Sequence, residues 1–157
     1  MTVVLLGSLW VNREVRAGDA PQAPTAATGK VYKVLPLLLN LEGQDATSPS
    51  LFDRDAYQAY LRLHPKEISG IRYDVLWWAK GTGTNATRLR MELRAVGPDG
   101  SPRVKTLEAS VSPGRFRHWA ELPLLGDDYV KLGRVVAWRA TLWSGDQILG
   151  TQQSFLW

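Results

Sequence analysis

Residues 87–96, TRLRMELRAV, carry the clearest structural signal in the sequence, because apolar and charged side chains alternate there without a break from Arg88 to Ala95. Successive side chains of a β-strand point to opposite faces, so this period of two predicts a strand with one face against a core and one in water. The expected inner row is Leu89, Met91, Leu93 and Ala95. The expected outer row is Arg88, Arg90, Glu92 and Arg94.

Neighbouring segments extend this strand into a sheet. Residues 97–101, GPDGS, form a turn by composition, so residues 102–111 should return antiparallel and bury Leu107, Ala109 and Val111. Further strands are expected over residues 31–42, 70–81 and 116–125, and Pro36 in the first of them favours an edge position or a bulge. The inner row expected for residues 70–81 is Ile71, Tyr73, Val75, Trp77 and Ala79.

The C-terminal residues 133–157 read as two strands joined at Ser144-Gly145-Asp146, a composition typical of a tight turn. The inner row expected before the turn is Val136, Trp138, Ala140 and Leu142. After the turn, Leu149, Phe155 and Trp157 are expected on one face of the last strand. Because a buried tryptophan contributes a large apolar area, Trp157 is expected to fill the space between two sheets.

One segment departs from the period of two. In residues 48–65 an apolar side chain recurs at helical intervals, Ser50 and Asp53 have the spacing of a capping box, and Pro65 ends the run. This pattern predicts a short α-helix over about residues 51–63 that covers one open end of the sandwich. The apolar face expected for the helix is Phe52, Ala56, Tyr60 and Leu63.

Seven short antiparallel strands at near-regular spacing predict an all-β fold, an immunoglobulin-like antiparallel β-sandwich with one short inserted α-helix. A tryptophan early in the domain (Trp77 or Trp78) and the penultimate strand LGRVVAWRATL, residues 132–142, resemble fibronectin type III modules over about residues 68–157. The cysteine pair of antibody domains is absent. SLFDRDAYQAYLRLHP (residues 50–65) and the terminal SFLW look like stretches of uncharacterised exported bacterial proteins.

Three segments are expected along the chain. Residues 1–16 contain an apolar run, too short to span a bilayer, that has the length of a secretory signal core, although no basic residue precedes it. We interpret it as a truncated signal or anchor, with a start codon assigned too far downstream; the alternative is an apolar strand or tail. Residues 17–29, rich in Ala, Pro and Thr, are expected to be a linker, and residues 30–157 the β-sandwich domain.

The residue inventory argues against catalysis. The chain has no cysteine and only two histidines, His64 and His118, which belong to different predicted elements. Neither has a second ligand at metal-binding spacing, and no serine-nucleophile or phosphate-loop motif is present. The sequence therefore predicts a non-enzyme without a cofactor. A further candidate is a calcium site formed by the loop carboxylates of Asp127 and Asp128. Asp99 or Asp146 would join it if the loops converge.

Two sets of side chains are candidate binding residues. The first is the outward basic row Arg88, Arg90 and Arg94, which could meet a polyanion unless Glu92 and a cross-strand partner such as Glu108 neutralise it. The second set consists of the tryptophans outside the inner rows, which could stack on sugars or anchor a protein interface, or be covered as part of a second core. These are Trp78, Trp119 and Trp143.

The function expected from this sequence is that of a non-catalytic, exported immunoglobulin-like module that makes protein–protein contacts in a cell-envelope or surface assembly. Its partner would be another protein or a second copy of the chain. The alternative is a carbohydrate-binding module that uses the sheet-face tryptophans. The formal net charge of +4, spread along the chain without a run, disfavours a nucleic acid. A membrane would be contacted only through residues 1–16, if they are retained.

Overall fold

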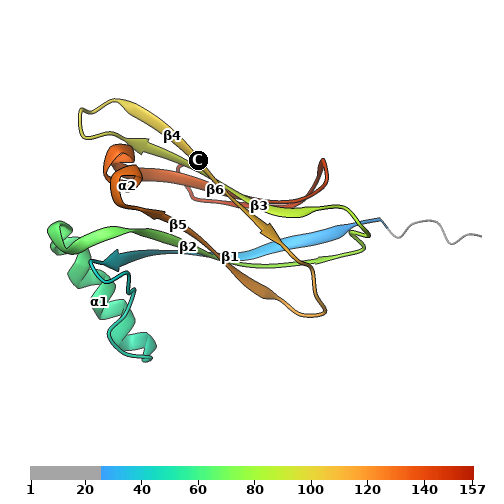
Figure 1. The fold of residues 1–157 in the computed structure, drawn as a ribbon, viewed down its shortest axis with the longest axis horizontal. Helices are drawn as coiled ribbons and strands as arrows, with labels where there is room; N and C mark the ends of the chain where they lie inside the picture. Colours follow the sequence, from blue (N-terminus) through green and yellow to red (C-terminus); the bar gives the residue numbers. More distant parts are fainter. Residues whose placement is uncertain (1–25) are drawn as a thin grey trace, which may run out of the picture.

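Two antiparallel β-sheets face each other in the computed structural model, which describes residues 26–157 (Figure 1). The three-stranded sheet has the order β1 (Thr28–Asn40), β2 (Ile68–Lys80), β5 (His118–Leu125). The four-stranded sheet has the order β4 (Pro102–Val111), β3 (Thr87–Val96), β6 (Arg134–Ser144), β7 (Gln147–Gln153). The predicted all-β sandwich of seven strands is confirmed. The signal-like residues 1–16, and residues 17–25 of the expected linker, lie outside the described residues, whereas β1 begins inside that linker at Thr28.

The core between the sheets is built largely from the predicted inner rows. The β2 side chains from Tyr73 to Ala79 and the β3 side chains from Leu89 to Ala95 alternate between buried and partly exposed, as their sequences indicate. Leu122 and Leu124 of β5 complete the inner layer. The row predicted on β4 (Leu107, Ala109 and Val111) is only half-buried and packs against the margin of the core, because β4 is an edge strand.

Two predictions for the C-terminal strands are wrong. A register shift between Arg94 and Ala95 leaves Val136 of β6 without a partner on β3, so Val135, and not Val136, packs against the core. Strand β7 ends at Gln153, and Phe155 is fully exposed. Trp157 does not lie between the sheets; its ring lies beneath the guanidinium groups of outer-row arginines, as described below. The tight turn at Gly145-Asp146 is as predicted, with a φ of 55° at Gly145.

Helix α1 (Leu51–Leu63) has the predicted bounds, and the hydroxyl of Ser50 accepts a hydrogen bond from the Asp53 amide at 3.4 Å. Its predicted face is wrong: Phe52, Ala56, Tyr60 and Leu63 are exposed, and the buried residues are Gln58 and Leu61. The register of β1 directs Leu37 and Leu39 to the outer face of the three-stranded sheet, where both are buried outside the core between the sheets. The helix therefore covers this outer face and not an open end of the sandwich.

The open end is occupied by a helix that the sequence did not predict. Figure 1 shows the sheets close together where β1 begins and diverging toward the end where α2 (Gly126–Leu132) lies between the layers. Leu132 of α2 is buried in the core, and Tyr129 packs against it. The remaining short element is the 3₁₀ turn η1 (Pro65–Glu67). None of the helices within residues 26–157 is both long and apolar enough to cross a bilayer.

A single glutamine fastens α1 to the edge of the three-stranded sheet. The Gln58 side chain accepts a hydrogen bond from the Leu38 amide at 2.8 Å and donates one to the Leu38 carbonyl at 2.9 Å, as a neighbouring strand would. Its Nε2 also donates to the Asp45 carbonyl at 2.8 Å. Since β1 is an edge strand, these bonds satisfy backbone groups that would otherwise be unpaired there.

Replacing Gln58 with alanine should lower the free energy of unfolding by about 1–3 kcal/mol, because buried backbone groups lose their partners. Urea denaturation followed by circular dichroism measures this change. Gln153→Ala is the matched control, since Gln153 is exposed and its side chain makes no hydrogen bond within residues 26–157. Equal stabilities of the two variants would show that Gln58 does not hold the helix to the strand.

Candidate functional site

Aromatic and basic side chains gather on the outer face of the three-stranded sheet, at the end where β1 begins. Trp78 lies opposite Lys30 of β1, and Trp119 of β5 lies opposite Leu76 of β2. The connection from β4 to β5 brings the adjacent residues 115–117 to the same place. We call this surface the aromatic–basic patch, and it consists of Tyr32, Trp78, Phe116, Trp119, Lys30, Lys33, Arg115 and Arg117.

A bulge in β1 places Tyr32 within the patch. The ladder to β2 pairs Val31 with Trp77 and Lys33 with Leu76, which leaves Tyr32 as the unpaired extra residue. The ring of Tyr32 lies 4.0 Å from the guanidinium carbon of Arg117 and 5.3 Å from the Lys30 ammonium. Both distances are within the range of cation–π attraction, so the bulge and the β4–β5 connection hold each other in place.

The centre of the patch is a shallow hollow of about 250 Å³. Its walls are Tyr32, Trp78, Arg115, Phe116 and Arg117. Phe116 is 71% exposed and Trp119 is 51% exposed. Large apolar rings that remain in water mark a surface that is covered by something else, because their burial against a partner is favourable.

The positive charge of the patch is not neutralised within the described chain. Lys30, Lys33, Arg115 and Arg117 make no ion pair with any residue in the range 26–157. On the same sheet face, by contrast, Arg72 is bound by Asp74 at 2.7 Å and lies near Asp45 and Glu121. Its pKa is raised mainly by the hydrogen bond to Asp74. The patch therefore presents free cations beside exposed rings.

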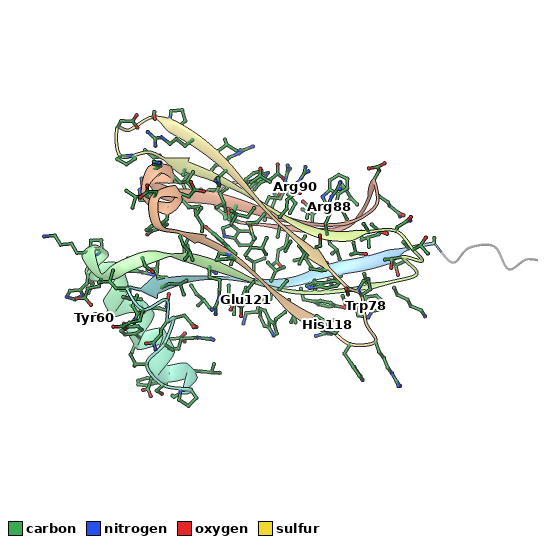
Figure 2. The ribbon with its side chains drawn as sticks, viewed as in Figure 1. Tyr60, Trp78, Arg88, Arg90, His118 and Glu121 are labelled. Carbon is green, nitrogen blue, oxygen red and sulfur yellow. The ribbon has the colours of Figure 1, made fainter. Side chains whose placement is uncertain are left out.

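The predicted candidate tryptophans do not share one surface. Trp78 and Trp119 belong to the patch, whereas Trp143 lies on the outer face of the four-stranded sheet, opposite Arg88 of β3. Figure 2 shows Trp78 on one sheet and Arg88 and Arg90 on the other. The two candidate sets, tryptophans and arginines, are thus brought together only at Trp143.

On that second face the basic row is occupied by intramolecular contacts. The guanidinium carbons of Arg88 and Arg90 lie 5.4 and 5.7 Å from the centroid of the Trp143 ring. Those of Arg94 and Arg139 lie 4.1 and 4.6 Å from the centroid of the Trp157 ring. Arg90 pairs with Glu108 at 2.6 Å, as expected for a cross-strand neighbour, and Arg139 pairs with Glu92 at 2.8 Å. The ion pairs neutralise Arg90 and Arg139, whereas Arg88 and Arg94 contact only tryptophan rings, so this face presents less free charge than the basic row suggests.

The histidines and the candidate calcium ligands stay apart. His64 stacks on Tyr60 at the α1 end, and His118 lies against Trp77 at the opposite end (Figure 2). Asp128 is on helix α2, not in a loop, and accepts a bond from Lys105 at 2.7 Å. Within residues 26–157 no group of three acidic, histidine or cysteine side chains could hold a metal ion.

Two of the three remaining calcium candidates, Asp99 and Asp127, have basic partners within residues 26–157. Hydrogen bonds from Ser101, joined by Arg103, lower the pKa of Asp99 to about 2. Asp127 lies 3.7 Å from Lys131 on α2, whereas Asp146 belongs to the β6–β7 turn. These carboxylates therefore do not converge on a shared metal site within residues 26–157.

Sequence reasoning missed Tyr32, Phe116 and the arginines on either side of Phe116. Tyr32 belongs to the patch only because of the bulge, which no pattern in the sequence indicates. The run Arg115-Phe116-Arg117 follows a Pro-Gly break, and a phenylalanine between two arginines in a connection is the one signal that could have identified it.

Comparison of the chain with protein-family models, with curated proteins and with solved structures found no significant match.

Proposed function

We propose that this protein is a non-catalytic, exported immunoglobulin-like module that contacts an acidic protein surface through the aromatic–basic patch, in a cell-envelope or surface assembly. The observation that carries the proposal is the set of exposed rings beside four cations without ion-pair partners. Aromatic residues and arginine are the side chains that contribute most to protein interfaces. Free cations would steer an acidic partner and set its orientation.

The strand order supports the immunoglobulin-like assignment and, within it, the fibronectin type III resemblance. Strands β1, β2 and β5 form one sheet, and β3, β6 and β7 are neighbours in the other. In a constant-type immunoglobulin domain the fourth strand joins the sheet of the first, second and fifth. Here β4 pairs with β3 instead, which favours the fibronectin-like variant of the sandwich.

Export is supported by the sequence of the first residues. The apolar run in residues 1–16 has the length of a secretory signal core, and the following residues 17–25 have the composition of a linker. A sandwich without cysteine has no disulfide to lose, so it is compatible with an oxidising compartment as well as a reducing one.

The alternative function is carbohydrate binding, and the position of two rings favours it. Leu76 pairs with Trp119, so Trp78 and Trp119 are diagonal neighbours on one face of β2 and β5. Two rings on one sheet face offer a surface on which sugar rings can stack, and the nearby cations would select an acidic glycan.

Three soluble probes separate these functions, with the tryptophan fluorescence of the whole chain as the readout. Poly-L-glutamate represents an acidic protein surface, heparin an acidic glycan, and cellohexaose a neutral one. We expect poly-L-glutamate to bind more tightly than heparin of equal charge and to protect Trp119 from iodide quenching. The double substitution Arg115→Glu and Arg117→Glu should weaken this binding by about tenfold or more, because like charges then face each other.

The matched control is Lys66→Glu with Lys131→Glu, which changes the net charge equally at exposed positions outside the patch. Equal losses in both double variants would mean that only net charge matters, and the patch would not be a site. Binding of heparin or cellohexaose in preference to poly-L-glutamate, abolished by Trp119→Ala, would establish the carbohydrate function instead.

A further inference from the structure

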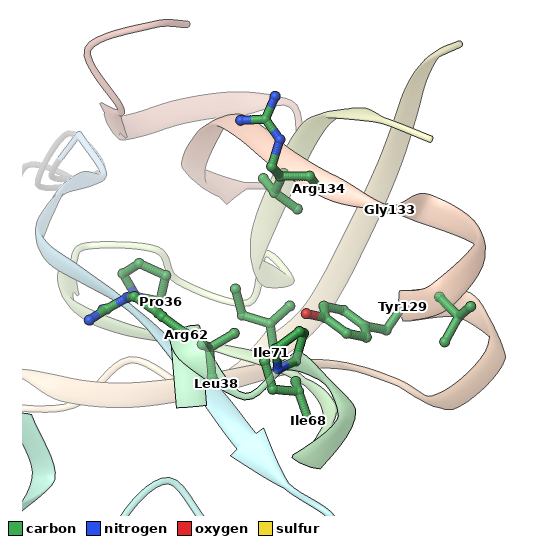
Figure 3. Close-up of a pocket in the computed structure, with 11 residues that line it drawn as sticks. Pro36, Leu38, Arg62, Ile68, Ile71, Tyr129, Gly133 and Arg134 are labelled. Carbon is green, nitrogen blue, oxygen red and sulfur yellow. The ribbon is translucent and has the colours of Figure 1, made fainter. Parts of the chain in front are cut away.

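The end of the sandwich opposite the aromatic–basic patch contains a larger and quite different cavity. It has a volume of about 630 Å³ and lies between the ends of β1 and β2 on one side and α2 with the start of β6 on the other (Figure 3). This volume is within the range of about 300–1,000 Å³ that is usual for small-molecule sites. Its apolar walls are formed mainly by Pro36, Leu38, Ile68, Ile71, Tyr129 and Val135. We call it the end pocket.

The end pocket exists because α2 bridges the diverging sheets without filling the space between them. Leu132, the last residue of α2, points into the core, and Tyr129 packs against the core's margin. The chain then turns at Gly133, which has a φ of 81° and no side chain to occupy the space. Secondary structure therefore forms most of the wall of this partly open cavity.

All the charge around the end pocket is positive. Arg62 of α1 and Arg134 of β6 line it, and no acidic residue does. Neither arginine forms an ion pair within residues 26–157. Both are exposed, and Figure 3 shows them at separate places on the rim of the pocket. Guanidinium groups bind carboxylate and phosphate oxygens through paired hydrogen bonds, so this rim is suited to an anionic head group.

Within the apolar interior there is one polar group. The hydroxyl of Tyr129 points toward Ile71 inside the pocket (Figure 3), and it makes no hydrogen bond to a side chain or backbone group of residues 26–157. Burial raises the pKa of Tyr129, so the hydroxyl stays protonated and able to donate. A hydrogen-bond donor at this position would fix the orientation of a ligand that the apolar walls otherwise bind only through van der Waals contact.

We propose that the end pocket binds a single-chain amphiphile with an anionic head group, such as a medium-chain fatty acid. The apolar walls would take up the hydrocarbon chain, and Arg62 or Arg134 would pair with the head group at the rim. A neutral ligand would leave the positive rim without a partner, and a fully polar ligand would gain nothing from the apolar walls. This inference is independent of the function proposed for the patch, because the two sites share no residue.

The test is a titration of the whole chain with dodecanoate, dodecyl phosphate and dodecanol, each below its micelle-forming concentration, by isothermal calorimetry. We expect one dodecanoate to bind per chain. Dodecanol should bind about tenfold more weakly, because it lacks one hydrogen bond to a charged group. Dodecyl phosphate shows whether the rim accepts any anionic head group or a carboxylate alone. The double substitution Arg62→Gln and Arg134→Gln should abolish the preference for the anionic ligands.

The matched control is Lys80→Gln with Arg94→Gln, which removes the same charge at exposed positions that line neither the end pocket nor the patch, and should leave dodecanoate binding unchanged. All four substituted residues are exposed, so circular dichroism should report an unchanged fold in both variants. Failure of both anionic ligands to saturate the chain would overturn the proposal. So would equal binding of dodecanol and dodecanoate, or equal loss of affinity in the two double variants. These results would leave the patch proposal untouched.

Discussion

Replacing Trp77 with alanine should lower the free energy of unfolding by about 3–5 kcal/mol, the usual cost of removing a large aromatic side chain from a core. Trp77 is 2% exposed, and it contacts the layer between the sheets from the middle strand of the three-stranded sheet. Its indole Nε1 makes no hydrogen bond within residues 26–157, so packing accounts for the whole contribution. Thermal and urea denaturation of the variant measure the loss.

The conservative variant Trp77→Phe should recover most of this stability, because it keeps an aromatic ring in the same space and removes only the unpaired nitrogen and the second ring. Trp119→Ala provides the matched comparison, since it deletes the same side chain from the exposed face of the neighbouring strand. A loss at Trp119 as large as that at Trp77 would mean that the core is not located between the sheets as described.

Gly133→Ala should be nearly as damaging, at about 2–6 kcal/mol, because backbone strain and overpacking each contribute about 1–3 kcal/mol. Gly133 has a φ of 81° and a ψ of −148°, a region that residues with a side chain avoid. An added Cβ would collide with the Val96 carbonyl oxygen and lie 2.9 Å from the Gly97 Cα. Both neighbours are backbone atoms, so they cannot move aside without displacing the β3–β4 turn.

Gly43→Ala separates the two contributions. Gly43 also has a positive φ, 79°, but an added Cβ there meets nothing within 4 Å. The Gly43→Ala substitution should therefore lower the free energy of unfolding by only about 1–2 kcal/mol, which is the contribution of backbone strain alone. Urea midpoints of the two variants give the comparison, and a Gly133→Ala variant no less stable than Gly43→Ala would contradict the close approach of α2 and β3.

The alternating strands were predictable from the sequence because their environment is simple. Residues 87–96 and 102–111 form β3 and β4 with the expected bounds, since the side chains of each strand alternate between the face toward the core and the face toward water. The errors occur where a local pattern cannot reveal a tertiary partner. The face of α1 was wrong because the helix is held by a polar residue, Gln58, and hydrophobic periodicity cannot identify a buried amide.

The bulge at Val136 and helix α2 were missed for a related reason. A bulge changes the phase of a strand without changing its composition, so the alternation in residues 134–144 predicts the wrong face for Val136. The α2 sequence GDDYVKL is too short for a helical period to appear, and its acidic pair is typical of a loop.

Two of the four aromatic rings of the patch could be predicted. Trp78 and Trp119 fall outside the inner rows, and that discrepancy correctly indicated that they lie on an outer face. Trp143 has the same signature but is covered by Arg88 and Arg90, and the sequence does not distinguish a ring that stacks on its own arginines from one that is free. The end pocket had no sequence signal, because its residues come from six separate elements.

The long ladder between β1 and β2 has a mechanical consequence. It runs without a gap from Thr28 opposite Lys80 to Asn40 opposite Ile68, apart from two register shifts. The N-terminal end of β1 lies at one tip of the domain, and the C-terminus lies nearer its middle (Figure 1). Tension between the two ends of the chain would therefore pull β1 along its own axis. The hydrogen bonds to β2 would then share the load in shear instead of opening one after another, so the domain should resist stretching better than its modest size suggests.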